Sequence, residues 1–261
     1  MHGALHVAKT GLSAQDTNLK VISNNLANAS TVGFKKDRAI FEDLLYQTRR
    51  QPGANSSQES QLPSGLQIGN GVRTVATQKI FTTGDLQITE QTFDIAINGR
   101  GFFQILKPDG QTAYTRNGEF SIDSDRRIVT SEGYPLEPEI VMPENVTTVT
   151  IGNDGTVTAV ISQEPEPVEL GVIELADFSN LQGLMAIGQN LFLETAASGA
   201  AVISIPGEDS TGVLKQGMLE GSNVNAVEEL VDMITTQRAY EMNSKVISTA
   251  DQMLSFITQQ I

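Results

Sequence analysis

Three small groups of residues in this sequence have the types and spacing that chemistry requires. His2 and His6 are four residues apart, so their imidazoles would share one face of a helix and could bind a metal ion. Asp123 and Asp125 could supply the carboxylate pair of a glycosidase or part of a calcium loop. The Gly-Arg-Gly run at residues 99–101 resembles half of a glycine-rich dinucleotide-binding turn.

Each of these groups lacks the partner that its chemistry needs. No third metal ligand follows the two histidines closely, and the chain has no cysteine for a thiolate site or a disulfide. The twelfth position of a calcium loop would be Tyr134 or Leu136, where the loop needs Glu. The glycine run precedes a strand-like segment instead of a helix N-terminus, which is the element that binds phosphate. We therefore expect no catalytic residue, no cofactor and no metal, and a protein that is not an enzyme.

The two ends of the chain carry the strongest pattern. Residues 222–261 contain no Pro, and no Gly follows Gly221, so a single long helix from Ala226 onward is expected. Its apolar residues recur every seven positions, at Met233, Tyr240, Ile247 and Leu254. A similar amphipathic stripe runs through the first 28 residues, at Leu5, Leu12, Leu19, Ile22 and Leu26. The two ends are predicted to pair as a coiled coil.

Three asparagines near the end of the first helix suggest a polar contact between packed helices. Asn24, Asn25 and Asn28 fall within five residues, although Asn competes with the helix backbone for hydrogen bonds. A fraying helix end would explain them, and so would a buried polar group that sets the register of a coiled coil. We favour the second interpretation, with Gly33 ending the helix in a left-handed conformation.

The middle of the chain is predicted to be β structure, and a polar arm precedes it. Residues 47–71 are rich in Gln, Ser, Gly, Asn and Pro, which predicts a flexible loop or an extended arm. From Val72 onward, apolar residues alternate with polar ones in short runs separated by turn signals such as Asn-Gly at 117–118. A β-sandwich, barrel or roll is expected from about residue 80 to residue 220.

Charge is distributed unevenly. The net charge is −14 for the whole chain, with +4 in residues 1–80, −15 in residues 81–221 and −3 in residues 222–261. The acidic middle excludes a nucleic-acid partner, because phosphate binding needs basic surface. It fits either general solubility or a surface that repels neighbouring proteins. No apolar run is long enough to cross a membrane, and the first residues lack a cleavable signal pattern, so we expect export without such a signal.

Three segments resemble one family of proteins. Residues 23–45, SNNLANASTVGFKKDRAIFEDLL, and residues 222–247, SNVNAVEELVDMITTQRAYEMNSKVI, resemble the terminal signatures of bacterial flagellar rod and hook proteins. Residues 84–103, GDLQITEQTFDIAINGRGFF, resemble their central motif. Within the family, residues 46–73 resemble the extended segment of the distal rod members. Alternatives are a proximal rod or hook type of axial protein, or a fibre protein of the phage-tail or adhesin kind.

The resemblance implies a structural subunit that assembles helically into a hollow, rigid drive shaft around an export channel. It implies self-assembly, proximal rod and hook proteins at the ends of the shaft, P- and L-ring proteins around it, and the flagellar type III export apparatus as partners. Its expected place is the basal body, from the periplasm to the outer membrane, without membrane insertion.

The expected fold is α+β, with an inserted, mainly antiparallel β domain and an extended arm. The terminal helices would form a discontinuous, coiled-coil-like core domain. The predicted division is 1–33 plus 222–261 for this core, 34–79 for the arm and 80–221 for the β domain. The predicted subunit-interface residues are Leu5, Leu12, Leu19, Ile22, Asn24, Asn25, Leu26, Asn28, Tyr46, Arg49, Arg50, Pro52, Met233, Tyr240, Ile247 and Leu254.

Overall fold

The computed structural model describes residues 2–52, 63–162, 164–208 and 210–259. The chain is α+β and divides into two compact units. The first, called here the helix–arm unit, contains the two terminal helices and residues 37–78. The second, called the β unit, contains residues 28–36 and 79–224. The short segment 28–36 therefore groups with the β unit, and the expected arm groups with the helices.

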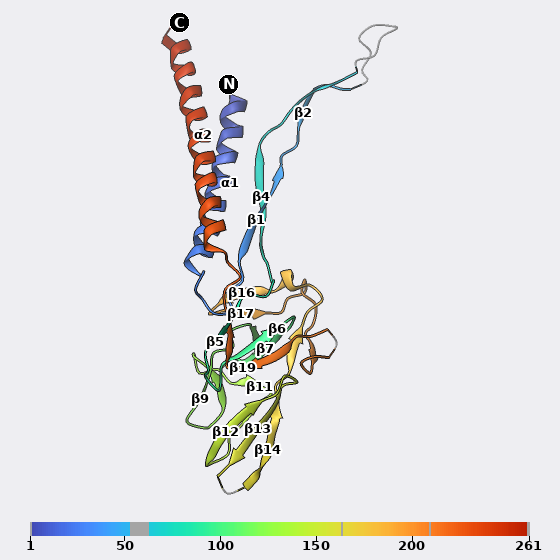
Figure 1. Cartoon of the computed structure of the whole chain (residues 1–261). Helices are drawn as coiled ribbons and strands as arrows, with labels where there is room; N and C mark the ends of the chain where they lie inside the picture. The colour runs from blue at the N-terminus through green and yellow to red at the C-terminus, as the bar shows by residue number, and fades with distance from the viewer. Residues whose placement is uncertain (1, 53–62, 163, 209, 260–261) are drawn as a thin grey trace. The chain divides into compact units, whose positions relative to one another are not determined.

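Two long helices lie side by side in the helix–arm unit (Figure 1). Helix α1 spans His2–Ala27 and helix α2 spans Ala226–Gln259, so α2 begins at the residue expected from the sequence. Asn225 caps α2, since its side-chain oxygen accepts a hydrogen bond from the Val227 N–H at 3.1 Å. Glu228 and Glu229 add negative charge to the first turn, where the helix dipole favours it.

The arm consists of paired strands. Strand β1 (Asp37–Asp43) pairs with β4 (Val72–Lys79), and β2 (Gln47–Arg50) pairs antiparallel with β3 (Leu66–Ile68). Where a flexible loop or an extended arm was expected over residues 47–71, the chain forms the paired strands β2 and β3, and residues 53–62 of this segment lie outside the described residues. Every residue of β2 and β3 is exposed. Strand β2 (Gln-Thr-Arg-Arg) has no apolar residue and β3 (Leu-Gln-Ile) has only three residues, so the period-two pattern that reveals a strand is too short to recognise here.

The β unit is built from short, mostly antiparallel strands. They are β5 (Leu86–Ile88), β6 (Ile95–Asn98), β7 (Phe102–Leu106), β8 (Thr112–Thr115), β9 (Phe120–Ile122), β10 (Ile128–Thr130), β11 (Leu136–Glu137), β12 (Val146–Ile151), β13 (Thr156–Ile161), β14 (Glu164–Val172), β15 (Leu175–Asp177), β16 (Met185–Gly188), β17 (Leu191–Leu193), β18 (Val202–Ser204), β19 (Val213–Gln216) and β20 (Met218–Glu220). A short 3-10 helix at Leu181–Gly183 precedes β16.

One larger sheet organises this unit. Its strands follow the order β16-β17-β8-β7-β15-β18, and β11 also pairs with β7. A second sheet has the order β12-β13-β14, and three two-stranded pairs join β9 to β10, β6 to β19 and β5 to β20. The Asn-Gly pair at 117–118 is typical of a hairpin, but it does not join β8 and β9 as one, because β9 pairs with β10 and β8 pairs with β7 and β17.

Apolar side chains pack on both faces of the main sheet. One core is mostly aliphatic and includes Ile95, Ile105 and Leu175. The other contains the aromatic residues Phe102, Tyr114, Phe178 and Phe192. Their rings meet edge to face, with centroids 4.8 to 6.0 Å apart, an arrangement that aromatic quadrupoles favour.

Within the part of the chain that the structure describes, no helix has the length and apolar character to cross a membrane.

Candidate assembly surface

The contact between α1 and α2 follows one antiparallel register through four pairs of residues that are seven positions apart. The Asn25 side chain donates a hydrogen bond to Glu229 at 3.2 Å, and seven residues earlier Asn18 donates to the Thr236 hydroxyl at 3.0 Å. One heptad further, Gly11 faces Asn243, whose amide nitrogen lies 3.2 Å from the point where a Gly11 Cβ would stand. Ala4 and Ala250 border the same groove at the far end. We call these four pairs the seam.

The seam is made of small and polar residues. Amide and hydroxyl groups bond only in the correct register, because a slip would leave them buried without partners. Asn25 also donates to the backbone oxygen of Asp37 at 2.9 Å and accepts from the Asp37 N–H at 2.9 Å. The same asparagine therefore fixes α1 against both α2 and the start of β1. The seam supplies specificity but buries little apolar area.

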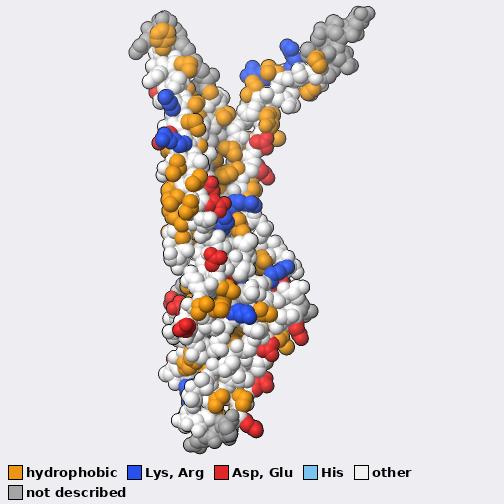
Figure 2. Space-filling model, in the orientation of Figure 1, with side chains coloured by type: hydrophobic (Ala, Val, Ile, Leu, Met, Phe, Trp, Pro, Cys, Tyr) orange, Lys and Arg blue, Asp and Glu red, His pale blue; other side chains and the backbone are white. Residues whose placement is uncertain are grey.

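Much of the apolar surface of α2 remains uncovered within the chain. Figure 2 shows hydrophobic side chains along the surface of the paired helices. The exposed apolar residues of α2 are Val227, Leu230, Val231, Ile234, Tyr240, Met242, Val246, Met253 and Phe256. Exposed apolar surface of this kind is typical of sites that contact another protein, a membrane or a ligand.

The predicted interface residues fall into three groups. On α1, Ile22 and Asn25 are buried, Leu5, Leu12, Leu19 and Leu26 are half-buried, and Asn24 is exposed. On α2, Met233, Ile247 and Leu254 are half-buried and Tyr240 is exposed. Asn28 is half-buried beyond the end of α1, where its side-chain oxygen accepts from the Thr31 hydroxyl at 3.1 Å. On the arm, Tyr46, Arg49, Arg50 and Pro52 are exposed.

The seam is the part that sequence reasoning largely missed. The heptad of Met233, Tyr240, Ile247 and Leu254 was visible because those residues are large and apolar. The interleaved positions Thr236 and Asn243 gave no apolar signal, although they repeat with the same period of seven. A search for polar and small residues at heptad spacing on both helices could have found them.

The arm meets α1 at a tightly packed glycine. A Cβ at Gly71 would stand 2.1 Å from the Thr10 hydroxyl oxygen, and the Gly71 φ of +108° is one that side chains rarely adopt. The Thr10 hydroxyl accepts a hydrogen bond from the Val72 N–H at 3.3 Å, and the Gly71 oxygen accepts one from the Leu44 N–H at 2.8 Å. Only glycine therefore lets the arm approach the helix this closely.

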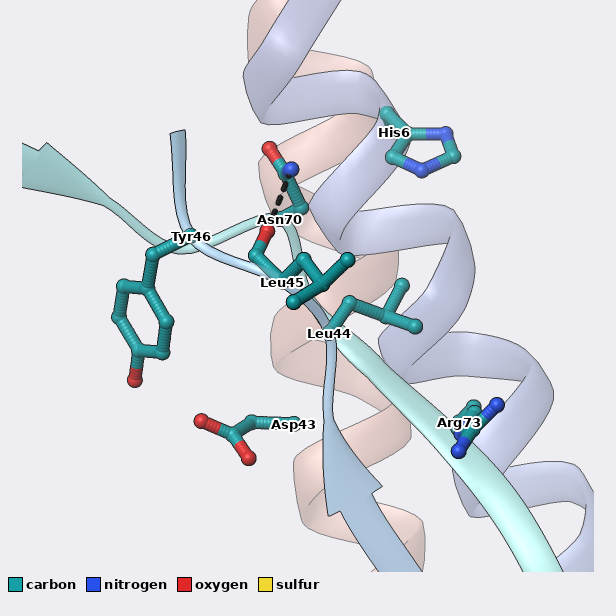
Figure 3. Close-up of a pocket in the computed structure, with 7 residues that line it drawn as sticks. All are labelled: His6, Asp43, Leu44, Leu45, Tyr46, Asn70 and Arg73. Carbon is teal, nitrogen blue, oxygen red and sulfur yellow. Dashed lines mark hydrogen bonds between the residues drawn. The ribbon is translucent and has the colours of Figure 1, made fainter. Parts of the chain in front are cut away.

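A hollow of about 550 Å³ lies beside this contact (Figure 3). It is lined by His6 of α1 and by Asp43, Leu44, Leu45, Tyr46, Asn70 and Arg73 of the arm. Asn70 closes the bend of the arm by donating to the backbone oxygen of Leu45 at 2.7 Å (Figure 3). The Leu45 side chain is 89 % exposed, which leaves a large apolar group at the bend without cover.

Tyr46 and Arg73, which line this hollow, both have carboxylate partners in the arm. A hydrogen bond to the Asp43 carboxylate raises the pKa of Tyr46 above its usual value. Arg73 pairs with Glu42 at 3.0 Å across β1 and β4.

In the β unit, the two carboxylates considered from the sequence as a glycosidase pair or calcium ligands are Asp123 and Asp125. Both pair with Arg127, at 3.4 and 3.3 Å.

The β unit contains a cluster of three buried charges. Glu220, at the end of β20, accepts a hydrogen bond from Lys35 at 2.5 Å and another from Arg116 at 3.1 Å. The side chains of Lys35 and Glu220 are 0 % exposed. Lys35 also donates to the Thr82 oxygen at 2.7 Å, and the Gly84 N–H donates to Glu220 at 2.9 Å. The cluster therefore binds segment 28–36 to the strands through which the chain enters and leaves the β unit.

Burial has the largest effect on the pKa values of the two basic residues in this cluster. Burial lowers the pKa of Lys35 below its usual value, and the Glu220 carboxylate opposes that shift. Burial likewise lowers the pKa of Arg116, again against the effect of Glu220.

Family models match three parts of the chain. Residues 5–35 match the model described as flagella basal body rod protein, and residues 96–159 match the D1 domain of flagellar hook protein FlgE/F/G. Residues 215–260 match the C-terminal model of the flagellar basal body rod FlgEFG proteins. The first and last of these matches cover most of α1 and α2.

Full-length relatives agree with these matches. The chain is 54 % identical over 256 residues to the flagellar basal-body rod protein FlgG of Buchnera aphidicola subsp. Acyrthosiphon pisum, with 98 % of each chain covered. It is 51 % identical to FlgG of Caulobacter vibrioides, with 98 % of each covered, and 50 % identical to FlgG of Borreliella burgdorferi, with 97 % of each covered. The chain therefore belongs to the FlgG family of flagellar basal-body rod proteins.

Proposed function

We propose that this protein is a structural subunit of the flagellar distal rod, polymerising helically into a hollow shaft that transmits torque and encloses the export channel. The observation that carries the proposal is the exposed apolar surface of α2 in a chain that aligns with FlgG proteins over nearly its full length. A helix pair held by a polar seam needs neighbours to cover that surface. Further copies of the same chain, packed as a tube, would supply them.

The terminal helices would form the inner, coiled-coil-like core of the tube, and the β unit would form its outer layer. The predicted interface residues then lie between subunits on α1, α2 and the arm. Proximal rod and hook proteins would join the two ends, and P- and L-ring proteins would surround the outer layer. The subunits would reach the growing tip through the flagellar type III export apparatus, and the shaft would cross the periplasm to the outer membrane.

Electron microscopy of the purified protein tests this function. We expect tubular polymers at high protein concentration. A variant with Val231→Asp and Ile234→Asp should remain monomeric, because the two carboxylates would be buried in the contact between helices. The control Gln237→Glu adds charge at an exposed polar position of the same helix and should still polymerise. Tubes formed equally well by the double variant would contradict the assignment of this surface.

The shape of the polymer separates the alternative assignments. A distal rod subunit should form straight, stiff tubes, whereas a hook-type subunit should form curved or flexible ones. Fibres without a central channel would favour the phage-tail or adhesin alternative.

A further inference from the structure

Both outer strands of the main sheet in the β unit lack the charges and prolines that often protect a sheet edge, although β16 has a register shift of the bulge type between Ala186 and Gly188. Strands β16 and β18 stand at the two ends of the strand order. Their sequences, Met-Ala-Ile-Gly and Val-Ile-Ser, contain no charged residue and no proline. Natural proteins normally place charges, prolines or bulges on such edges, because the unpaired N–H and C=O groups can pair with another chain.

The side chains on these edges are also apolar and uncovered. Val202 and Ile203 on β18 are 55 % and 53 % exposed, and Met185 on β16 is 51 % exposed.

The two edges are complementary in direction. Each strand in the order β16-β17-β8-β7-β15-β18 is antiparallel to its neighbour, so β16 and β18 run in opposite directions. A second copy in the same sheet orientation would place its β16 antiparallel to β18 of the first. The alternation of strands would then continue across the contact without a break.

The two edges also match in the faces that their side chains occupy. Ile203 is paired with Ala176, and Ala186 is paired with Phe192, and both of these partners belong to the aromatic core. Directly paired residues of antiparallel strands share a face. Ile203 of one copy and Ala186 of the next would therefore lie on the same face when paired, with Val202 opposite Ile187 on the other face.

We propose that β18 of one subunit pairs head to tail with β16 of the next, so that the main sheet continues from copy to copy. This inference rests on the self-assembly proposed above. Because the two surfaces are different, the contact does not close on itself as a two-fold dimer would, and repeated contacts generate rings or helical filaments. Main-chain hydrogen bonds would supply attraction, and the alternating apolar side chains would fix the register.

Cysteine cross-linking of assembled material tests this pairing, since the natural chain has no cysteine. The main variant carries Ile203→Cys and Ala186→Cys together, and a second carries Val202→Cys and Ile187→Cys. A covalent species larger than one chain can form only when a disulfide joins two chains, so the size of the oxidised products reports the contact between subunits.

We expect mild oxidation of the tubes to give a ladder of dimers, trimers and longer covalent chains in at least one double variant. Each single-cysteine variant should stay monomeric under the same oxidation. Tubes that form without any ladder would overturn the pairing and leave the proposed function intact. Dimers from a single-cysteine variant would overturn the head-to-tail arrangement, because they would show one edge pairing with itself. Absence of tubes from the unmodified protein would overturn both proposals.

Charged edges provide an independent readout. The variant Val202→Lys with Ile203→Lys should raise the protein concentration needed for polymerisation by roughly tenfold or more, because charges oppose edge pairing. The control Ile122→Lys with Val141→Lys adds the same charge at two exposed apolar positions of the β unit and should polymerise as the unmodified protein does. Equal effects of the two variants would contradict a specific role for β18.

Discussion

Glu220 is the residue on which the buried charges of the β unit depend. Replacing it by Gln would leave Lys35 and Arg116 buried without a carboxylate between them. Breaking a buried ion pair in this way costs about 3–5 kcal/mol of unfolding free energy. Urea denaturation of the purified monomer measures this loss. As a control, Glu139→Gln removes an exposed partner of Arg127 and should change stability by less than about 0.5 kcal/mol. Equal effects of the two variants would show that the cluster contributes no special stability.

The lowered pKa of Lys35 predicts how stability changes with pH. In the unfolded chain this lysine has its ordinary pKa of 10.5, and in the folded chain the pKa is lower. Between the two values the folded state binds fewer protons than the unfolded state, so the stability contributed by Lys35 rises with pH. Lys35→Met removes this titration. The difference in unfolding free energy, unmodified protein minus variant, should therefore increase as pH rises toward 10.5, and a constant difference would contradict the shift.

Asn25 is the residue that joins the two helices and the arm. Asn25→Ala removes the donor to Glu229 and the acceptor for the Asp37 N–H, so buried polar groups lose their partners. The expected cost is about 1–3 kcal/mol, measured as a lower midpoint of helix unfolding by circular dichroism. Ser23→Ala, at an exposed position of the same helix, should leave that midpoint nearly unchanged. A similar loss in both variants would mean that Asn25 has no register role.

At the scale of elements, the sequence predicted the helices and strands that bury only one of their faces. Helices α1 and α2 were predictable because large apolar residues repeat along one face. Gly33 was expected to end α1, but the helix ends earlier, at Ala27. The strands of the β unit were predictable where buried residues alternate with less buried ones, as in β13. The ribbon of β2 and β3 could not be recognised, because all of its residues are exposed and its composition resembles a loop.

Long-range partners were predictable only where the residue types were unusual. The asparagines near residue 25 suggested a polar contact between helices, and the structure supplies Glu229 as the partner of Asn25. Glu220 gave no signal, since one more acid in an acidic segment looks like surface charge. Which of 31 acidic residues is buried depends on the order of strands, and the sequence pattern does not reveal that order.

The exposed ribbon of the arm leads to a prediction about stiffness. A two-stranded ribbon with both faces in water is marginally stable alone, so its apolar residues Leu45, Leu66 and Ile68 are expected to contact neighbouring subunits. We expect deletion of residues 46–73 to leave a polymer that bends more easily, because subunits lose a brace against sliding. Electron micrographs would measure its persistence length. The paired substitutions Arg49→Gln and Arg50→Gln keep the arm and provide the control for charge alone. A straight and stiff polymer from the deletion variant would show that the arm does not contribute to the stiffness of the polymer.

At the scale of the whole molecule, the polar seam suggests that assembly completes the folding of the helices. Helices α1 and α2 have 26 and 34 residues, so together they supply most of the helical signal of the chain. The seam sets their register but buries little apolar area, and helices in water depend on tertiary packing for stability. We therefore expect circular dichroism at 222 nm to strengthen when monomers assemble into tubes. The variant Val231→Asp with Ile234→Asp, kept under the same conditions, should retain the weaker monomer signal. Equal helix content in monomer and tube would show that the helix pair is fully folded before assembly, and that the apolar surface of α2 serves contact between subunits alone.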